Sequence, residues 1–139
     1  MKATIAWKGD ALFEAKTESG HTLTIDGPPD QGGKNQGPRP METMLVGLGA
    51  CTSFDVMMIL RRSRQVVSDC VATVKAKRAD EIPAVFTDIH IHFEIKGTDV
   101  SPKQVERAIK MSADKYCSAS IMLERGGVKI THDYTIAES

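Results

Sequence analysis

Cys51 and Cys117 are the residues whose types and settings best suit chemistry. Each is followed by small polar residues, Thr52-Ser53 and Ser118-Ala119-Ser120. Both lie in segments with helical spacing, and these are the only long helical segments, so we expect them to pack together. Two thiols at such a contact form a disulfide where their Cα atoms approach to about 6 Å. Two core cysteines would give the same pattern, so the pattern alone leaves both interpretations open.

A redox thiol also needs conditions that favour its thiolate, such as a nearby cation or a helix N-terminus. Asp55 follows Cys51 by one helical turn on the same face, and its negative charge disfavours a thiolate there unless a cation neutralises it. A carboxylate in an apolar helix needs a partner, and we expect an ion pair between Asp55 and an arginine. Arg39, in the segment GPRP, is the only arginine in the first third of the chain and is the candidate cation for Cys51.

Four further residues have plainer interpretations. Cys70 lies on the apolar side of a predicted strand, where a free cysteine is usually a small core residue. His90 and His92 are two apart on a strand and share a face, but no third ligand is indicated, so we expect a solvated face and no metal site. Glu42 lies at the start of a helix, where the helix dipole stabilises a carboxylate.

Composition restricts the class of protein. The chain has 139 residues, 41% of them hydrophobic, and a formal net charge of zero, which predicts a single domain over 1–139 and no nucleic-acid or anionic-membrane partner. No uninterrupted apolar run reaches transmembrane length and no signal peptide is recognisable, so we expect a cytoplasmic protein. An odd number of cysteines at wide spacing does not make a secreted disulfide framework, and no nucleotide or cofactor motif is present.

The elements that must position these residues alternate in type. Short strands at about 4–7, 11–16 and 21–25 are separated by turn residues and predict a meander. A Gly- and Pro-rich segment, 27–40, then predicts a long mobile loop. A nearly apolar helix over 41–62 is followed by strands over 66–78 and 85–96, a helix from the Ser101 cap to about 124, and a last strand over 128–136. This order is typical of an α+β fold.

Two segments carry a family resemblance: PMETMLVGLGACTSFDVMMILRRSRQ around Cys51 and MSADKYCSASIML around Cys117. They resemble the OsmC/Ohr family (osmotically induced protein C and organic hydroperoxide resistance), and most of all its YhfA-like branch. In that branch a proline-glutamate segment leads into a helix with Gly-Cys and an aspartate four residues later. The resemblance covers essentially the whole chain. It implies an intertwined homodimer with a long central helix from each subunit and sheets wrapped around the two helices.

The resemblance also implies an activity. Cys51 would be the peroxidatic thiolate, which attacks an organic hydroperoxide and becomes a sulfenic acid. Cys117 would be the resolving thiol, which closes a disulfide that an external dithiol of lipoyl type reduces. The implied role is peroxidase activity in oxidative-stress defence, with the redox pair at a dimer interface.

Two departures from the family pattern concern the catalytic partners of the thiolate. In the well-characterised peroxidases a catalytic glutamate directly follows the proline, whereas here Met41 does and Glu42 comes next. On a continuous helix Glu42 and Cys51 lie on opposite faces, about 13 Å apart along the axis. Those enzymes also use an arginine from the N-terminal strands, and this chain has none before Arg39. Glu42 and Arg39 are therefore the candidate replacements.

Two other functions fit the same fold. A non-enzymatic member would bind a small hydrophobic molecule in an apolar groove at the dimer interface, with both cysteines merely lining it. A redox sensor would pass oxidation on to a partner protein. The identity of the peroxide and of the reductant is not encoded in any motif.

Overall fold

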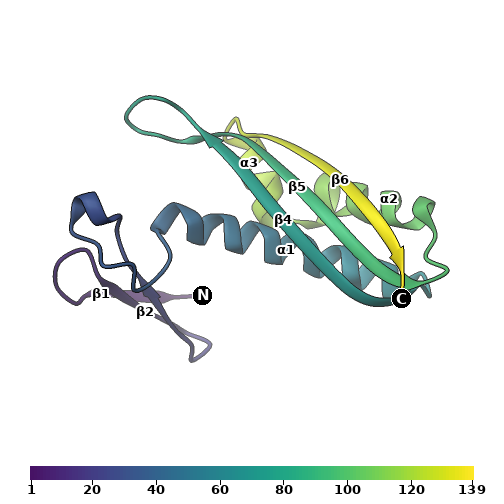
Figure 1. Ribbon diagram of the computed structural model, residues 1–139, viewed down its shortest axis with the longest axis horizontal. Coiled ribbons are helices and arrows are strands. Elements are labelled where there is room, and N and C mark those ends of the chain that lie inside the picture. Colours follow the sequence, from purple (N-terminus) through teal and green to yellow (C-terminus); the bar gives the residue numbers. More distant parts are fainter. The chain divides into compact units, whose positions relative to one another are not determined.

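The computed structural model describes residues 1–139, which divide into two compact units, Met1–Met44 and Leu45–Ser139. The first unit is an antiparallel sheet in the order β1-β2-β3 (Figure 1). Its strands are β1 (Ala3–Trp7), β2 (Phe13–Thr17) and β3 (Thr22–Ile25). The predicted N-terminal meander is confirmed.

The Gly- and Pro-rich segment after β3 is organised around one carboxylate. Asp26 is buried and accepts hydrogen bonds from the backbone N–H groups of Gly27, Lys34 and Gln36, at 2.8, 3.0 and 3.1 Å. These bonds, led by that of Lys34, hold the pKa of Asp26 below its usual value. A short 3₁₀ turn, η1 (Pro29–Gln31), lies within the segment. The segment predicted as a mobile loop is thus fastened at its centre by a charged acceptor.

Helix α1 (Pro40–Arg62) starts in the first unit and continues into the second. Its start has one half of a capping box, in which the backbone N–H of Arg39 donates to Glu42 Oε1 at 2.9 Å. In the second unit Leu48, Val56 and Leu60 are fully buried on one stripe of the helix. By length and composition alone α1 is apolar enough to cross a membrane, a property that a search for uninterrupted apolar runs missed. The burial of this stripe is the behaviour of a core helix.

The second unit has a mixed sheet covered by helices on one face (Figure 1). Strand β5 (Phe86–Thr98) is central, antiparallel to β4 (Val66–Arg78) and parallel to β6 (Lys129–Glu138). Along β5, Ile89, Ile91, Phe93 and Ile95 are buried under the helices. A side chain at Gly49 would put its Cβ 3.0 Å from Val74 Cγ2 on β4, so a glycine lets α1 approach the sheet closely.

The predicted second helix is interrupted, which corrects the expectation of one helix from Ser101 to about 124. Ser101 caps α2 (Pro102–Met111) as expected. A π-helical turn, η2 (Ser112–Tyr116), follows, and a separate helix, α3 (Ser118–Arg125), begins after it. Cys117 is the extended residue between them, with φ −76° and ψ 101°. The spacing of its neighbours predicted that Cys117 lies in the middle of a helix. That prediction is wrong, because Cys117 lies between two helices. The α+β order is otherwise confirmed.

Candidate functional site

Cys51, Cys117 and Asp55 form one cluster in the second unit. The two Sγ atoms and a carboxylate oxygen all lie within 4.8 Å of one another. Both cysteines are free thiols; Cys51 is half-buried and Cys117 is buried. The sequence prediction that the two cysteine-bearing segments pack together is therefore confirmed.

The regular geometry of α1 positions the first half of the cluster. Cys51 and Asp55 are one turn apart, so they lie on the same face, beside the buried stripe that ties the helix to the core. Thr52 belongs to that stripe, and its hydroxyl donates to the carbonyl of Leu48 at 2.9 Å. The same hydroxyl oxygen lies 3.3 Å from Cys117 Sγ. Either atom can be the donor of this contact: the Thr52 hydroxyl accepts from the Cys117 S–H while that thiol is protonated, and it donates to the sulfur once the thiolate forms.

The break in the helix after η2 positions Cys117, the second half of the thiol cluster. The backbone N–H of Cys117 donates to the carbonyl of Ser112 at 2.8 Å, which closes the π-helical turn. The chain then turns, and Cys117 Sγ becomes the N-terminal cap of α3 by accepting from the backbone N–H of Ser120 at 3.4 Å. A continuous α-helix would not give this cap, because in it the Ser120 N–H would bond to a backbone carbonyl.

The environments of the two thiols are unequal. Burial raises the pKa of the Cys117 thiol above its usual value, and the hydrogen bonds from Thr52 and Ser120 only partly oppose this effect. Cys117 is fully excluded from solvent, whereas Cys51 is partly accessible. A small molecule from solvent therefore meets Cys51 Sγ first.

Asp55 has a different partner from the one expected. The hydroxyl of Ser112 donates to its Oδ2 at 3.2 Å, and no arginine nitrogen lies within the 4.0 Å of an ion pair. The expected ion pair between Asp55 and an arginine is wrong. A hydroxyl from η2 takes its place and connects α1 to the π-helical turn.

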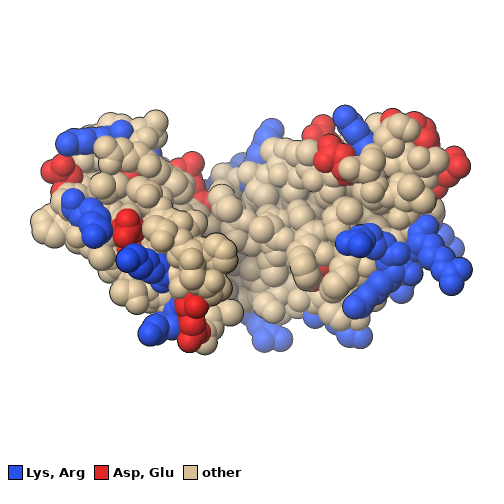
Figure 2. All heavy atoms as spheres, turned by 90° about the horizontal axis from the view of Figure 1, so that it is seen from below, with Lys and Arg blue, Asp and Glu red and all other residues tan.

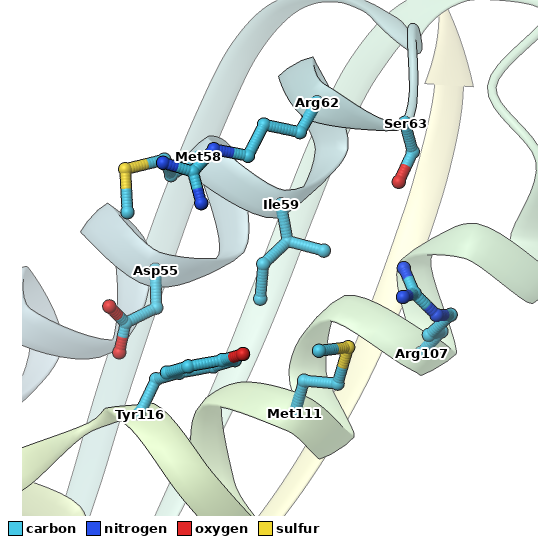
Figure 3. Close-up of a pocket in the computed structure, with 8 residues that line it drawn as sticks. All are labelled: Asp55, Met58, Ile59, Arg62, Ser63, Arg107, Met111 and Tyr116. Atoms are coloured by element: carbon cyan, nitrogen blue, oxygen red, sulfur yellow. The ribbon is translucent and has the colours of Figure 1, made fainter.

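Beyond Asp55 the surface is hollowed into a pocket of about 320 Å³. Figure 3 shows Asp55 beside the ring of Tyr116 at one end, with Arg62 of α1 and Arg107 of α2 on opposite walls. The pocket thus has apolar side chains and two cationic side chains in its walls. Asp55 belongs both to this pocket and to the thiol cluster. It is lined by Asp55, Met58, Ile59, Arg62, Ser63, Arg107, Met111 and Tyr116.

Arg39 and Glu42, the other two predicted site residues, belong to the first unit. The guanidinium of Arg39 donates to Asn35 Oδ1 at 3.3 Å and to the carbonyl of Gly37 at 3.2 Å. Glu42 accepts the capping bond from the Arg39 backbone. All these bonds lie within the first unit, so each residue has a local role in fastening the start of α1.

The remaining candidates lie on the sheet of the second unit. Cys70 is half-buried on β4, and burial raises the pKa of its thiol. His90 and His92 lie on the face of β5 away from the helices, as expected, but a third group is present. Asp133 Oδ1 lies 2.8 Å from His90 Nε2 and 2.6 Å from His92 Nδ1. The prediction missed it because it depends on the parallel pairing of β5 with β6.

Known proteins share both sequence and fold with this chain. The family model described as OsmC-like protein matches residues 33–133. Protein YhfA of Escherichia coli (strain K12) is 40% identical over 136 residues, which is 98% of each chain. The chain belongs to the OsmC-like protein family. The resemblance that its two cysteine segments indicated is thereby confirmed.

Solved structures share the fold of this chain. A hypothetical protein from Aquifex aeolicus VF5 is 30% identical, with a TM-score of 0.82 over 98% of this chain and 96% of that one. A protein from Legionella pneumophila has a TM-score of 0.70 at 16% identity, covering 96% and 95% of the two chains. That protein is described as an organic hydroperoxide resistance protein OsmC and a predicted redox protein. At this identity the likeness shows the OsmC fold alone.

Sequence reasoning missed three residues of the site in this OsmC-like chain. Thr52, Ser112 and Ser120 all hydrogen-bond to the cluster. The small polar residues beside each cysteine were a visible signal for Thr52 and Ser120. No local signal marked Ser112, because its contact with Asp55 joins residues 57 apart in the chain.

Proposed function

We propose that this OsmC-like protein reduces organic hydroperoxides through the Cys51/Cys117 thiol pair, in defence against oxidative stress in the cytoplasm. The observation that carries the proposal is the pairing of two thiols within 4.8 Å, one accessible and one buried. An accessible thiol suits attack on a substrate, and a buried thiol beside it suits capture of the oxidised product before a second oxidation.

The proposed reaction has three steps. The Cys51 thiolate attacks the terminal oxygen of ROOH, the O–O bond breaks, and RO⁻ takes up a proton and leaves as an alcohol. The Cys117 sulfur then attacks the Cys51 sulfenic acid, so the S–O bond breaks, water leaves and a disulfide forms. An external dithiol, such as a lipoyl group, finally supplies two electrons and two protons and restores both thiols.

Asp55 is the proposed proton carrier of the resolving step. One of its carboxylate oxygens lies within 4.8 Å of both sulfurs, and the hydroxyl of Ser112 donates to Oδ2 of the same carboxylate. When Cys117 attacks, it must lose its proton, and the hydroxide that leaves Cys51 must gain one. A carboxylate close to both sulfurs can accept the first proton and deliver the second.

The pocket beyond Asp55 supports an organic substrate over hydrogen peroxide. Met58, Ile59 and Met111 give it apolar walls, and burial of an alkyl or aromatic group against them stabilises the bound substrate by about 0.8 kcal/mol per CH₂. Hydrogen peroxide has no group to bury there. We therefore expect cumene hydroperoxide to react faster than hydrogen peroxide.

The proposal includes a homodimer. On α1, Val46 and Phe54 are 65% and 66% exposed. In Figure 2 the Lys and Arg side chains of the second unit gather mostly at its right-hand end, and its surface nearer the middle of the view is largely uncharged. In the first unit, strand register puts Ile5 and Trp7 on one face of the sheet, where they are 57% and 67% exposed. Exposed apolar surface on this scale is typical of a subunit interface. Light scattering should give twice the mass of the chain at micromolar concentration.

Arg39 and Glu42 are proposed to complete the site only in the assembled protein. Arg39→Ala should then lower the rate at which the Cys51 thiol reacts with hydroperoxide, and Glu42→Gln should do the same. If both variants keep the full rate and lose only stability, the two residues act solely in the local bonds of the first unit.

A second candidate function is favoured by the same pocket. Its apolar walls with two arginines suit a small hydrophobic molecule that carries a negative charge, and a binding protein would need no turnover. Steady-state assays with a dithiol reductant separate the two functions. Consumption of cumene hydroperoxide that needs both the dithiol and Cys51 supports the enzyme; no consumption above the Cys51→Ser background contradicts it.

A further inference from the structure

We propose that reduced Cys51 and Cys117, together with Asp55, form a binding site for a thiophilic divalent cation such as Zn²⁺. This inference goes beyond the proposed peroxidase function, because it concerns the reduced protein at rest and needs no turnover. It follows from the donor atoms and from the way the fold holds them.

The spacing of the donors fits a tetrahedral ion. With Zn–S bonds of about 2.3 Å and Zn–O bonds of about 2.1 Å, neighbouring ligand atoms lie roughly 3.5–3.8 Å apart. The two sulfurs and the carboxylate oxygen already lie within 4.8 Å of one another. Small rotations of three side chains would bring all three donors to bonding distance of one central ion.

The fold restricts these donors before any ion binds. Cys51 and Asp55 come from successive turns of one helix, and Cys117 is fixed by the cap of α3. The hydroxyl of Ser112 donates to Asp55 Oδ2 and so restricts this carboxylate. The Ser120 N–H, which donates to Cys117 Sγ, is the kind of outer hydrogen bond that orients a metal ligand. The fourth position is left to water.

Charge and donor type both favour a soft cation. Once ionised, the three ligands carry three negative charges, and none of them forms an ion pair with an arginine or lysine. A divalent ion neutralises most of this charge. Two sulfur donors select Zn²⁺ or Cd²⁺ over Mg²⁺ and Ca²⁺, which prefer oxygen ligands. Binding of M²⁺ to the two thiols releases two protons to solvent.

The ion and the disulfide exclude each other. A Cys51–Cys117 disulfide removes both sulfur ligands, so oxidation of the pair by a hydroperoxide releases the ion. Conversely, a bound ion occupies the lone pair with which Cys51 would attack. The metal-loaded protein should therefore react with hydroperoxide more slowly than the metal-free reduced protein.

The test is a titration of the reduced full-length protein with Co²⁺ under anaerobic conditions, followed by displacement with Zn²⁺. We expect one Co²⁺ per chain, with thiolate-to-cobalt charge-transfer absorption and the visible bands of a tetrahedral ion. Asp55→Asn should weaken binding at least tenfold, and Cys51→Ser should remove most of the charge-transfer signal. Cys70→Ser is the matched control and should bind Co²⁺ like the parent protein.

Three results would overturn the inference: no thiolate–cobalt absorption in the reduced protein, the same absorption after Cys51→Ser, or unchanged affinity in Asp55→Asn. Far-UV circular dichroism of each variant establishes that it is folded, and Cys51→Ala replaces Cys51→Ser if the latter is not. Because the titration involves no peroxide, its outcome is independent of whether the protein proves to be a peroxidase. Absence of peroxidase activity with normal cobalt binding would contradict only the proposed function.

Discussion

Cys51 and Cys117 reach the same cluster by different structural means. Cys51 is part of a regular helix and keeps some exposure, whereas Cys117 occupies a break between two helices and is buried. The regular helix supplies a carboxylate one turn away, at Asp55. The break instead supplies a hydrogen bond to the sulfur itself, from Ser120 N–H, and leaves the sulfur 3.3 Å from the Thr52 hydroxyl of α1.

This difference suits each thiol to the role proposed for it. The accessible sulfur can meet a substrate but has few groups that hold it, so it suits the attacking position. The buried sulfur is held by its neighbours and burial raises its pKa, so it suits the resolving position, in which it meets only the oxidised Cys51. In this chain the break in the helix is therefore what separates the environment of the proposed resolving thiol from that of the proposed attacking one.

The largest expected effect comes from removing the accessible thiol. Cys51→Ser should lower the rate of hydroperoxide consumption at least about a thousandfold, because a hydroxyl is a poor nucleophile without an activating base. The rate is measured with cumene hydroperoxide and a dithiol in excess. Substantial activity that persists in this variant would transfer the attacking role to another residue.

Removing the buried thiol should block a different step, the formation of the disulfide. Cys117→Ser should still react once with hydroperoxide, and then accumulate sulfenic acid at Cys51, which a dimedone-type reagent labels. With excess peroxide the label should disappear as the sulfinic acid forms, since no neighbouring thiol intercepts the intermediate. If Cys117→Ser turns over like the parent protein, the division of roles between the two thiols is wrong.

A smaller effect is expected at the carboxylate that both sulfurs share. Asp55→Asn should slow disulfide formation about a hundredfold, as expected for loss of a general acid–base group, while the first attack on hydroperoxide changes less. Stopped-flow measurements that resolve the two steps check this. An equal effect on both steps would indicate that Asp55 supports the site only structurally.

The hydroxyl of Thr52 should affect only the buried thiol, and more weakly. Its hydrogen bond lowers the pKa of Cys117, which burial has raised, so Thr52→Val should raise that pKa further. Disulfide formation needs the Cys117 thiolate, so its rate should increase with pH up to the raised pKa, and the variant's profile should shift to higher pH. A profile that does not move would contradict this role of Thr52.

The smallest effect is expected outside the cluster. Cys70 is also half-buried, and burial raises its pKa too, but it lies on the sheet and is not part of the cluster of Cys51, Asp55 and Cys117. Cys70→Ser should leave hydroperoxide consumption within about twofold of the parent value, the range expected of a substitution away from the site. A large loss of activity would show that a third thiol takes part in the cycle.

Much of this structure could be predicted from local sequence. The alternating strands, the apolar helix and the Ser101 cap follow from side-chain periodicity and capping chemistry. The break at Cys117 could not be predicted, because no Gly or Pro marks it and residues 102–124 keep helical spacing throughout. It is stabilised by the local thiol cap of α3 and by two tertiary contacts with α1, Ser112 with Asp55 and Cys117 with Thr52.

The partners of charged residues could not be predicted from local sequence either. The arginine expected beside Asp55 was a reasonable prediction from charge alone, but the fold provides a serine hydroxyl instead. Asp133 meets His90 and His92 only because β6 pairs in parallel with β5, and a parallel pairing leaves no signal in either strand. Local patterns therefore predicted the elements and the paired cysteines, and missed the contacts that the fold creates between elements.

The most direct test of the two-thiol account is disulfide mapping after oxidation by one equivalent of cumene hydroperoxide. The account predicts that each chain loses two thiols and that mass spectrometry of peptides finds one disulfide, between Cys51 and Cys117, with Cys70 still free. Dihydrolipoamide should then restore both thiols. No loss of thiols, or a disulfide that includes Cys70, would contradict the account.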